Sequence, residues 1–552
     1  MPLMGSLYIG TSGLQTSQNS LNTTAHNLSN LDTTGFVRQQ ILQGSAVYNT
    51  IRVSPNSVAN QQVGTGVVYS KVRQVRDVFL DKTFRMENGR NAFYEASAKA
   101  IEEVEGLLGE LGTSPFSESV DDLWQAIQEL SKNPASATNQ TLLVQRAAEF
   151  ATKSTAIYQG LCDYQDNLNF GIYTGINQIN DIGNKIKELN DQIREIETAG
   201  IETANDLRDV RNQLLDELSA LADITYSDDL FGNIVVKIEG NDFVTAAKCY
   251  NIEMDVDPTT GFYTPFWPQN ATYTMGEEGA ELVDFSSALV FRTDRTISSA
   301  TNTDIGSIKS MLYARGDRRA NYTDLEDPKH YNDDIAQSVI MNVQAEYDQL
   351  IHAIVTGMNK VLEEASDEAT GYLCNADGSP IQLFTKKTTN AYEKNELTGE
   401  WEFVEEDPEH TETLYTSSNI QINIDLVRQP SMLNFVKEDG SEDFTTISKL
   451  EDLFEEEKYT LNPNLKSVSN FSDYYADLIS QVSNTGNVFL SIVDSQTMTV
   501  DQTDAAREQI MGVSSEDELS GMIRFQNAYN AASRYITVID EMLEHLVSTL
   551  GA

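Results

Sequence analysis

The segment Met522–Leu550 reads MIRFQNAYNAASRYITVIDEMLEHLVSTL and decides the architecture of this chain. Its apolar side chains recur at alternating steps of three and four residues, which is the a/d pattern of a coiled coil. This C-terminal seam consists of Met522, Phe525, Tyr529, Ala532, Ile536, Ile539, Leu543, Leu546 and Leu550. Because such a stripe gains burial energy only against a second helix, the pattern predicts a helical partner.

The opposite end of the chain carries a second stripe. Leu7, Leu14, Leu21 and Leu28 recur every seven residues in a segment otherwise rich in small and amide residues. The segment predicts a polar helix that ends near Asn30, because Asp32-Thr33-Thr34-Gly35 is typical of a turn. We predict that both ends are mobile in the monomer and fold against each other or against neighbouring subunits. On pattern alone, an intrachain core and an assembly interface fit these seams equally well.

Helical periodicity also dominates much of the interior. Residues 91–160 favour helices, with breaks near Gly112–Ser114 and Asn133–Pro134. Apolar seams at 172–196 and 207–221, separated by a turn at Ala199-Gly200, predict a helical hairpin. A further helix is predicted from about Asp333 to Glu364.

Two interior stretches favour strands instead. Residues 225–300 contain the β-branched run Ile234–Ile238 and the turn sequence Asp257–Gly261. Residues 371–430 are mixed, with a hairpin turn predicted at Asn375–Gly378. The expected fold class is therefore mainly α with β insertions: paired terminal coiled-coil helices, a long-helix domain and a small outer β domain.

The predicted domains are nested. Residues 1–45 with 505–552 form a terminal helical domain. Residues 46–224 with 301–504 form the long-helix domain, which includes the mixed segment near 371–430. Residues 225–300 form a β-rich inserted outer domain.

The composition argues against several classes of protein. The chain has 84 acidic and 38 basic residues, and its formal net charge of −46 repels nucleic acid and anionic lipid. No stretch approaches the roughly 20 apolar residues of a membrane helix, and the N-terminus lacks the features of a cleaved signal peptide. Cys162, Cys249 and Cys374 form no CxxC pair, and none of the five histidines lies in an HExxH motif. We therefore predict no metal, no cofactor and no catalytic site.

The segment LNTTAHNLSN (21–30), followed by TGFVRQ (34–39), resembles the N-terminal signature of bacterial flagellar axial proteins, the rod, hook and hook-associated family. The motif positions are Asn27, Asn30, Thr34, Gly35 and Phe36. Later segments are similar to the hook-associated protein 1 branch of this family: residues 64–80, 207–218, 371–384, 420–430 and 524–534. They occur in the family's order and extend over nearly the whole chain.

The chain also departs from the family pattern. His26 stands where the family often has a polar amide or a serine, Asp317–Asp334 is longer than usual, and the segment 385–415 is shorter. These departures concern the outer architecture.

The resemblance implies a structural, non-enzymatic subunit of the junction between hook and filament. It implies export through the flagellar type III system and an extracellular location. The implied partners are other copies of the chain in a helical or ring array, the hook protein below, the second junction protein and the filament above, and a cytoplasmic export chaperone at the C-terminal helix. The two seams would then be assembly interfaces.

Two alternatives are a different flagellar axial protein (hook subunit, second junction protein or flagellin) and a secreted coiled-coil adhesin. The long central helices and the order of the motifs disfavour the first alternative. The adhesin is disfavoured because the chain has no stalk repeats and no membrane anchor.

Overall fold

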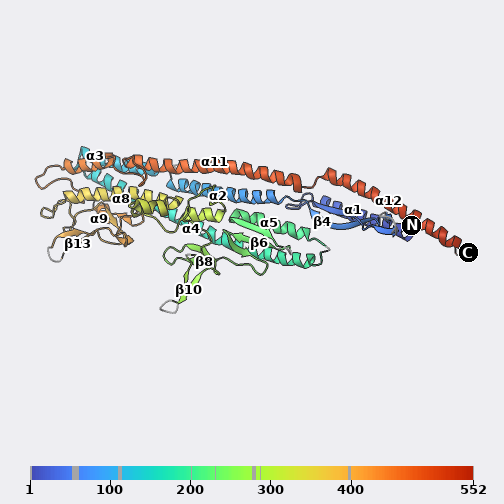
Figure 1. The fold of residues 1–552 in the computed structure, drawn as a ribbon. Helices are drawn as coiled ribbons and strands as arrows, with labels where there is room; N and C mark the ends of the chain where they lie inside the picture. Colours follow the sequence, from blue (N-terminus) through green and yellow to red (C-terminus); the bar gives the residue numbers. More distant parts are fainter. Residues whose placement is uncertain are drawn as a thin grey trace.

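The computed structural model describes residues 3–52, 61–109, 115–200, 202–229, 232–275, 281–285, 287–395 and 399–550. The helices of at least nine residues are α1 (Leu3–Ser29), α2 (Val78–Leu108), α3 (Phe116–Lys132), α4 (Ala137–Glu197), α5 (Asn205–Leu221), α6 (Ser307–Arg315), α8 (Val339–Ala365), α10 (Phe444–Glu455), α11 (Phe471–Met511) and α12 (Ser515–Leu550). The molecule is elongated, and its long helices follow its length (Figure 1). Both termini lie at one end, where α1 and α12 pack together. The predicted class, mainly α with β insertions, is confirmed.

Helix α4 is the longest of the described helices and runs through the central body (Figure 1). Its 61 residues span about 90 Å at 1.5 Å per residue. It packs against α3, α5 and α6, whereas α2 lies along α11. Asp77 caps the start of α2 by accepting hydrogen bonds from the backbone N–H groups of Phe79 and Leu80.

The main core lies among α3, α4, α8 and α11. The ring of Phe116 contacts those of Phe150, Tyr347 and Tyr475 at centroid distances of 5.8, 5.3 and 5.0 Å. All four side chains are fully buried. Aromatic side chains bury large areas, so this cluster stabilises the end of the body distant from the termini.

The strands form small antiparallel sheets at the margins of the helical body. Their bounds are β1 (Gln39–Ser45), β2 (Asn49–Arg52), β3 (Gln61–Val63), β4 (Val67–Gln74), β5 (Ile224–Asp228), β6 (Ile234–Ile238), β7 (Asn241–Val244), β8 (Glu253–Val256), β9 (Tyr263–Phe266), β10 (Thr272–Met275), β11 (Glu281–Asp284), β12 (Phe384–Lys386), β13 (Tyr392–Lys394), β14 (Trp401–Phe403) and β15 (Ile420–Ile422). Strands β5, β6 and β7 form a sheet, and the other strands pair as β1–β4, β2–β3, β8–β9, β10–β11, β12–β15 and β13–β14. Val236 and Phe243 of the three-stranded sheet share a core with Ile179 and Ile186 of α4.

Several sequence predictions are confirmed by the secondary structure. Helix α1 ends at Ser29, next to the predicted stop at Asn30. Helices α4 and α5 form the predicted hairpin, with Gly200 in its turn at φ +64°. Strand β6 coincides with the run Ile234–Ile238, and Gly261 at φ +74° ends the turn that joins β8 to β9.

Other predictions were wrong or incomplete. No helix begins near Ile172, because α4 continues without interruption from Ala137 to Glu197. Helix α8 starts at Val339, since Tyr331–Ile335 forms a separate π-helical turn. The predicted break at Gly112–Ser114 lies outside the described residues. The 41-residue helix α11 and the antiparallel pair formed by β1 and β4 were not predicted from the sequence.

Candidate assembly interface and its connector

Helix α12 turns its predicted seam toward α1, and the two helices run antiparallel. Gly10 lies opposite Ile536, so close that a Cβ at Gly10 would stand 2.7 Å from Ile536 Cγ1. Gly13 lies opposite Ala532, and Gly521 lies near Thr24. Because glycine has no side chain, it lets the two backbones approach.

The seam residues of α12 differ in burial. Ile539 is buried, with 6% of its surface exposed. Six members are half-buried: Met522, Phe525, Tyr529, Ala532, Ile536 and Leu543. Leu546 is 42% exposed, and the side chain of Leu550 lies outside the described set. The burial of the seam therefore declines toward the C-terminus.

Helix α1 buries small and polar residues rather than its leucines. Gly10 and the polar side chains Ser6, Thr16, Ser17, Ser20, Thr24 and Asn27 are buried. Three of the hydroxyls donate to carbonyls one turn earlier: Thr16 to Ser12, Ser17 to Gly13 and Ser20 to Thr16, at 2.8–2.9 Å. Because these donors are satisfied within the helix, their burial costs little. Leu7, Leu14, Leu21 and Leu28 are only half-buried, beside this face.

A further apolar stripe on α12 is uncovered. Tyr535, Val538 and Met542 follow one another at steps of three and four residues and are 41–51% exposed, although the Tyr535 ring also lies beside Gly10 of α1. The stripe meets the end of the seam at Leu546. On α1, Met4 and Tyr8 are exposed as well. The helix pair thus keeps apolar surface available for another molecule.

The residues of the family motif lie at the end of α1 and in the segment that follows it. The Asn27 amide donates to the Gln39 carbonyl at 2.9 Å and accepts from the Gln39 N–H at 3.0 Å. Asn30 Nδ2 donates to the His26 carbonyl at 3.0 Å. Gly35 has φ +78°, a conformation that favours glycine, and the Phe36 ring meets His26 edge-on at 5.4 Å.

Thr34 of the same motif is exposed. The remaining motif residues therefore fold the segment back along the end of α1, and we call residues 30–38 the connector.

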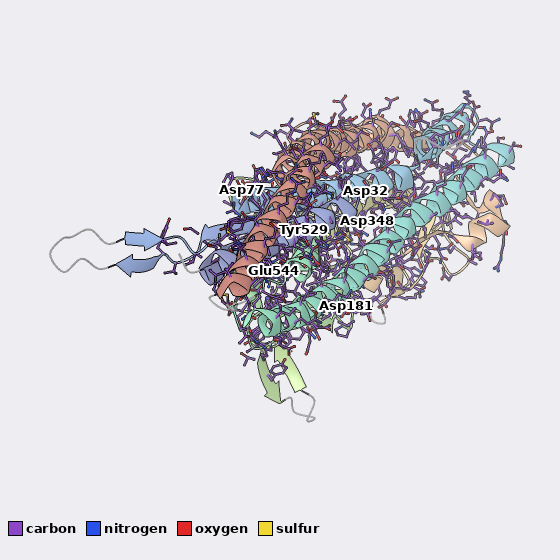
Figure 2. All side chains as sticks on the ribbon, turned by 90° about the vertical axis from the view of Figure 1, so that its right-hand side faces the viewer. Asp32, Asp77, Asp181, Asp348, Tyr529 and Glu544 are labelled. Carbon is purple, nitrogen blue, oxygen red and sulfur yellow. The ribbon has the colours of Figure 1, made fainter. Side chains whose placement is uncertain are left out.

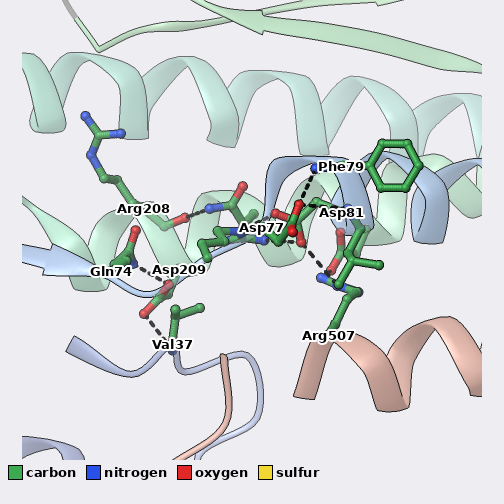
Figure 3. Close-up of polar contacts among 12 residues, drawn as sticks. Val37, Gln74, Asp77, Phe79, Asp81, Arg208, Asp209 and Arg507 are labelled. Atoms are coloured by element: carbon green, nitrogen blue, oxygen red, sulfur yellow. Dashed lines mark hydrogen bonds and ion pairs between the residues drawn. The ribbon is translucent and has the colours of Figure 1, made fainter. Parts of the chain in front are cut away.

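The connector is anchored on α5. Asp209 is buried, and its carboxylate accepts a hydrogen bond from the Val37 N–H at 3.2 Å and another from Gln74 Nε2 at 2.5 Å (Figure 3). Burial raises the pKa of Asp209 to about 7, although both hydrogen bonds and the nearby Arg76 favour its charged form. Its neighbour Asp206 accepts from Gln39 Nε2 at 2.8 Å. The segment of α5 that resembles the family's central helix therefore lies against the connector and holds it through hydrogen bonds.

An ion-pair network joins α11 to the same place. Arg507 contacts Asp81 of α2 at 3.1 Å (Figure 3). It also contacts Asp216 of α5 at 2.8 Å. Asp81 is also paired with Arg76 at 2.5 Å, and Asp216 with Arg85 at 2.6 Å. Side chains from α2, α5, α11 and the segment between β4 and α2 thus meet at one charged cluster that lies largely out of solvent.

A second link ties the connector to the start of α12. Arg38 Nε contacts Glu518 Oε1 at 2.7 Å, and the Arg38 N–H donates to the Met511 carbonyl at 2.9 Å. Sequence reasoning missed Arg507, Arg38 and their acidic partners. No periodic signal marks them, because their partners are distant in the sequence.

The residues that the structure describes contain no group of three or more His, Cys, Asp or Glu placed to hold a metal ion. None of the described helices is both long enough and apolar enough to cross a membrane.

Three family models match the chain. The flagellar hook-associated protein FlgK helical domain matches residues 101–372. The flagella basal body rod protein model matches residues 7–36, and the flagellar basal body rod FlgEFG protein C-terminal model matches residues 509–549. The two terminal matches fall on α1 with its connector and on α12.

Full-length relatives and a solved structure agree with these matches. Flagellar hook-associated protein 1 of Bacillus subtilis is 25% identical over 545 residues, covering 98% of this chain and 96% of that protein. The Escherichia coli protein of the same name is 24% identical over 574 residues, covering 97% of this chain and 98% of its own. The structure of the flagellar hook junction protein FlgK from Burkholderia pseudomallei covers 79% of this chain and all of that chain, with a TM-score of 0.53 and 11% identity. This last likeness concerns the fold.

Proposed function

Since the chain belongs to the flagellar hook-associated protein 1 family, we propose that its paired terminal helices are the element through which it assembles at the junction between hook and filament. The protein is a structural, non-enzymatic subunit of the extracellular flagellum. The family membership argues against the two alternatives, an adhesin and a different axial protein.

The observation that carries this proposal is the unequal coverage of the terminal pair. Helix α12 directs one apolar seam toward α1 but leaves Val538, Met542 and the end of the seam at Leu546 largely exposed. The pair lies at one end of the molecule, apart from the main core. An exposed stripe of this kind gains free energy when a second protein surface covers it.

We propose that different parts of the chain have different roles in the assembled subunit. The C-terminal seam (Met522 to Leu550) packs on the small and polar face of α1 and holds the terminal pair together. The leucine seam (Leu7 to Leu28), beside that face, borders the contacts with neighbouring subunits. The ribbon formed by β1 and β4 belongs with residues 1–45 and 505–552, because both strands contact α1. The long helices and the β insertion at 225–300 then form the outer part of the subunit.

The proposed partners follow from the family. They are further copies of the chain in a helical or ring array, the hook protein on one side, and the second junction protein with the filament on the other. Subunits joined head to tail through heterologous contacts produce such arrays. We also propose export through the flagellar type III system, with a cytoplasmic chaperone that covers the C-terminal helix before export.

Deletion of the gene tests the location. Cells without the protein should carry hooks but no filaments and should release flagellin into the medium. Missing hooks, or normal filaments and swimming, would each overturn the assignment.

Two substitutions test the role of the terminal pair. Ile536→Asp places a charge in the seam and should abolish incorporation, while the body keeps its thermal unfolding transition. Met542→Glu places a charge on the uncovered stripe. It should leave the pair folded and still prevent filament attachment. Asp540→Glu, at an exposed acidic position of the same helix, is the matched control and should assemble normally. Normal junctions with both Ile536→Asp and Met542→Glu would refute the proposal.

A further inference from the structure

The charge of the chain is divided unevenly between its N-terminal segment and the rest. Residues 1–76 contain one acidic residue, Asp32, and five basic residues: Arg38, Arg52, Lys71, Arg73 and Arg76. Their formal charge is +4, so the remaining 476 residues carry −50 of the total of −46. The N-terminal segment is therefore a basic element on a strongly acidic protein.

Part of that basic charge is not used within the subunit. Arg38 and Arg76 are paired with Glu518 and Asp81. Lys71 and Arg73, both on β4, are exposed and have no ion-pair partner among the described residues. Unpaired surface cations on an acidic protein are attracted to the acidic surface of another molecule.

These two cations lie at the base of a ribbon of strands, on the strand pair that contacts α1. We call the strands β1 to β4, within the described residues 39–52 and 61–74, the ribbon. Strands β1 and β4 pair along α1, and the ribbon continues into β2 and β3, which stand clear of the helical body (Figure 2). Apolar side chains are exposed where the two pairs of strands meet: Val47 (89%), Tyr48, Val67 and Val68. The ribbon thus offers apolar contact area next to positive charge.

The end of α12 offers the opposite combination. From Tyr535 onward the chain contains three acidic residues, Asp540, Glu541 and Glu544, and no lysine or arginine. All three acidic residues are exposed, and so are Met542, Leu546 and Val547. This part of α12 extends past the beginning of α1, at the same end of the molecule as the ribbon (Figure 1).

We propose that the ribbon of one subunit docks on the acidic and apolar end of α12 of a second copy of this chain. This inference rests on the proposed function, because it names a contact between the terminal domains of assembled subunits. Charge complementarity selects a second copy as the occupant. The interface is heterologous, so the α12 end of each subunit is free to receive the ribbon of the next.

A charge-reversal experiment tests the contact in cells that lack the native gene. Lys71→Glu with Arg73→Glu should reduce the fraction of hooks that carry filaments by about tenfold or more, because like charges would then face each other. Glu541→Lys with Glu544→Lys should cause a similar loss. All four changes together should restore filaments. Lys82→Glu, which reverses an exposed lysine on α2 outside the ribbon, is the matched control and should have no effect.

A cross-link identifies the occupant. Arg73→Cys and Glu541→Cys in the same full-length chain should give oxidised multimers of this protein in isolated hook–filament junctions. Circular dichroism and thermal unfolding of each purified variant should match the parent protein, so that loss of filaments is not loss of folding.

The outcomes separate this inference from the proposed function. If Ile536→Asp abolishes assembly but the Lys71 and Arg73 reversals do not, the ribbon contact is wrong and the assembly role of the terminal pair stands. Failure of the four-fold variant to restore filaments would also overturn the contact. A cross-link from position 73 to hook protein or flagellin would show that a different protein occupies the ribbon.

Discussion

Replacement of Arg507 by methionine should loosen the joint between the terminal pair and the body. Arg507 is almost fully buried, contacts both Asp81 and Asp216, and lies over the ring of Phe84 at 4.1 Å. Removal of one partner from a buried ion pair costs about 3–5 kcal/mol when the remaining charge has no other partner. Here Asp81 keeps Arg76, and Asp216 keeps Arg85. We therefore expect a smaller cost, about 2–3 kcal/mol.

Hydrogen exchange of backbone amides measures this loss of stability at the residues around position 507. A local loss of 2–3 kcal/mol corresponds to an increase of about 30- to 150-fold in the exchange rate of amides that open by local unfolding. The affected amides should be those at the end of α11 (residues 504–511), whereas those of α4 should be unchanged. Arg507→Lys should give an intermediate increase, because one ammonium group cannot reproduce the planar fork that reaches both carboxylates.

The matched control is Lys449→Met, which removes an exposed ion pair with Glu364 at 2.9 Å. An exposed pair contributes about 0–1 kcal/mol, so exchange in α10 should change by less than about fivefold. If Arg507→Met changes exchange in α11 no more than Lys449→Met changes it in α10, the network does not hold the joint.

Three further predictions concern the terminal pair, the connector and the buried acids. Gly10→Ala places a methyl group against Ile536 and should weaken the packing of α1 on α12 by about 1–3 kcal/mol, measured by hydrogen exchange or proteolysis. Gly5→Ala, with open space around it, should instead stabilise α1 by up to about 1 kcal/mol. Equal effects of the two substitutions would refute the close contact at Gly10. Asn27→Ala removes both hydrogen bonds to Gln39 and should cost about 1–3 kcal/mol, seen as faster exchange of the Gln39 amide while α5 is unaffected; an unchanged Gln39 amide would count against the bond. Burial raises the pKa of Asp209 and Glu346 to about 7, so the folded chain binds more protons than the unfolded chain, and the stability from each group is lost as pH rises through its folded pKa. Between pH 6 and pH 8 we expect a loss of about 1 kcal/mol for each group in denaturant unfolding, and a flatter profile in Asp209→Asn and Glu346→Gln; a free energy of unfolding that rises over this range would contradict the assignment.

The sequence predicted α12 correctly, because the face that this helix turns toward α1 is made of large apolar residues. The a/d steps of α12 are visible because Phe525, Ile536 and Leu543 differ sharply from their neighbours in hydropathy. The same steps on α1 are hidden. Ser6, Gly10, Gly13, Ser17, Ser20, Thr24 and Asn27 also alternate at four and three residues, but small polar residues give no hydropathy signal. The leucine stripe was therefore the pattern that stood out, although the leucines are only half-buried.

The connector could not be predicted for a different reason. The bond between the Val37 N–H and Asp209 joins residues 172 positions apart, and the pair of Arg38 with Glu518 spans 480 positions. A single polar residue carries no sign of a partner at that distance. The resemblance to the flagellar family marked both the motif near Gly35 and the segment around Asp209, and the structure brings these two segments together.

The segments Asp317–Asp334 and 385–415, for which the sequence predicts departures from the family pattern, contact each other on α8. The Tyr322 hydroxyl donates to Glu406 at 3.0 Å, and the Tyr322 ring stacks on His352 of α8 at a centroid distance of 3.8 Å. Two segments that are distant in the sequence therefore meet at one place on α8.

Burial differs between the terminal pair and the body in a way that bears on assembly. Among the described side chains of α1 and α12, Ile539 is the one large apolar side chain that is buried, whereas the body has the cluster around Phe116. A fully buried aliphatic side chain stabilises by about 1.5–3 kcal/mol, and a half-buried one by less. Fixing each residue of α1 costs about 1–2 kcal/mol of backbone entropy. The pair alone therefore recovers little of its ordering cost, and we propose that coverage of Tyr535, Val538 and Met542 by a neighbour supplies the missing burial. On this proposal, folding of the ends and incorporation into the flagellum are parts of one equilibrium.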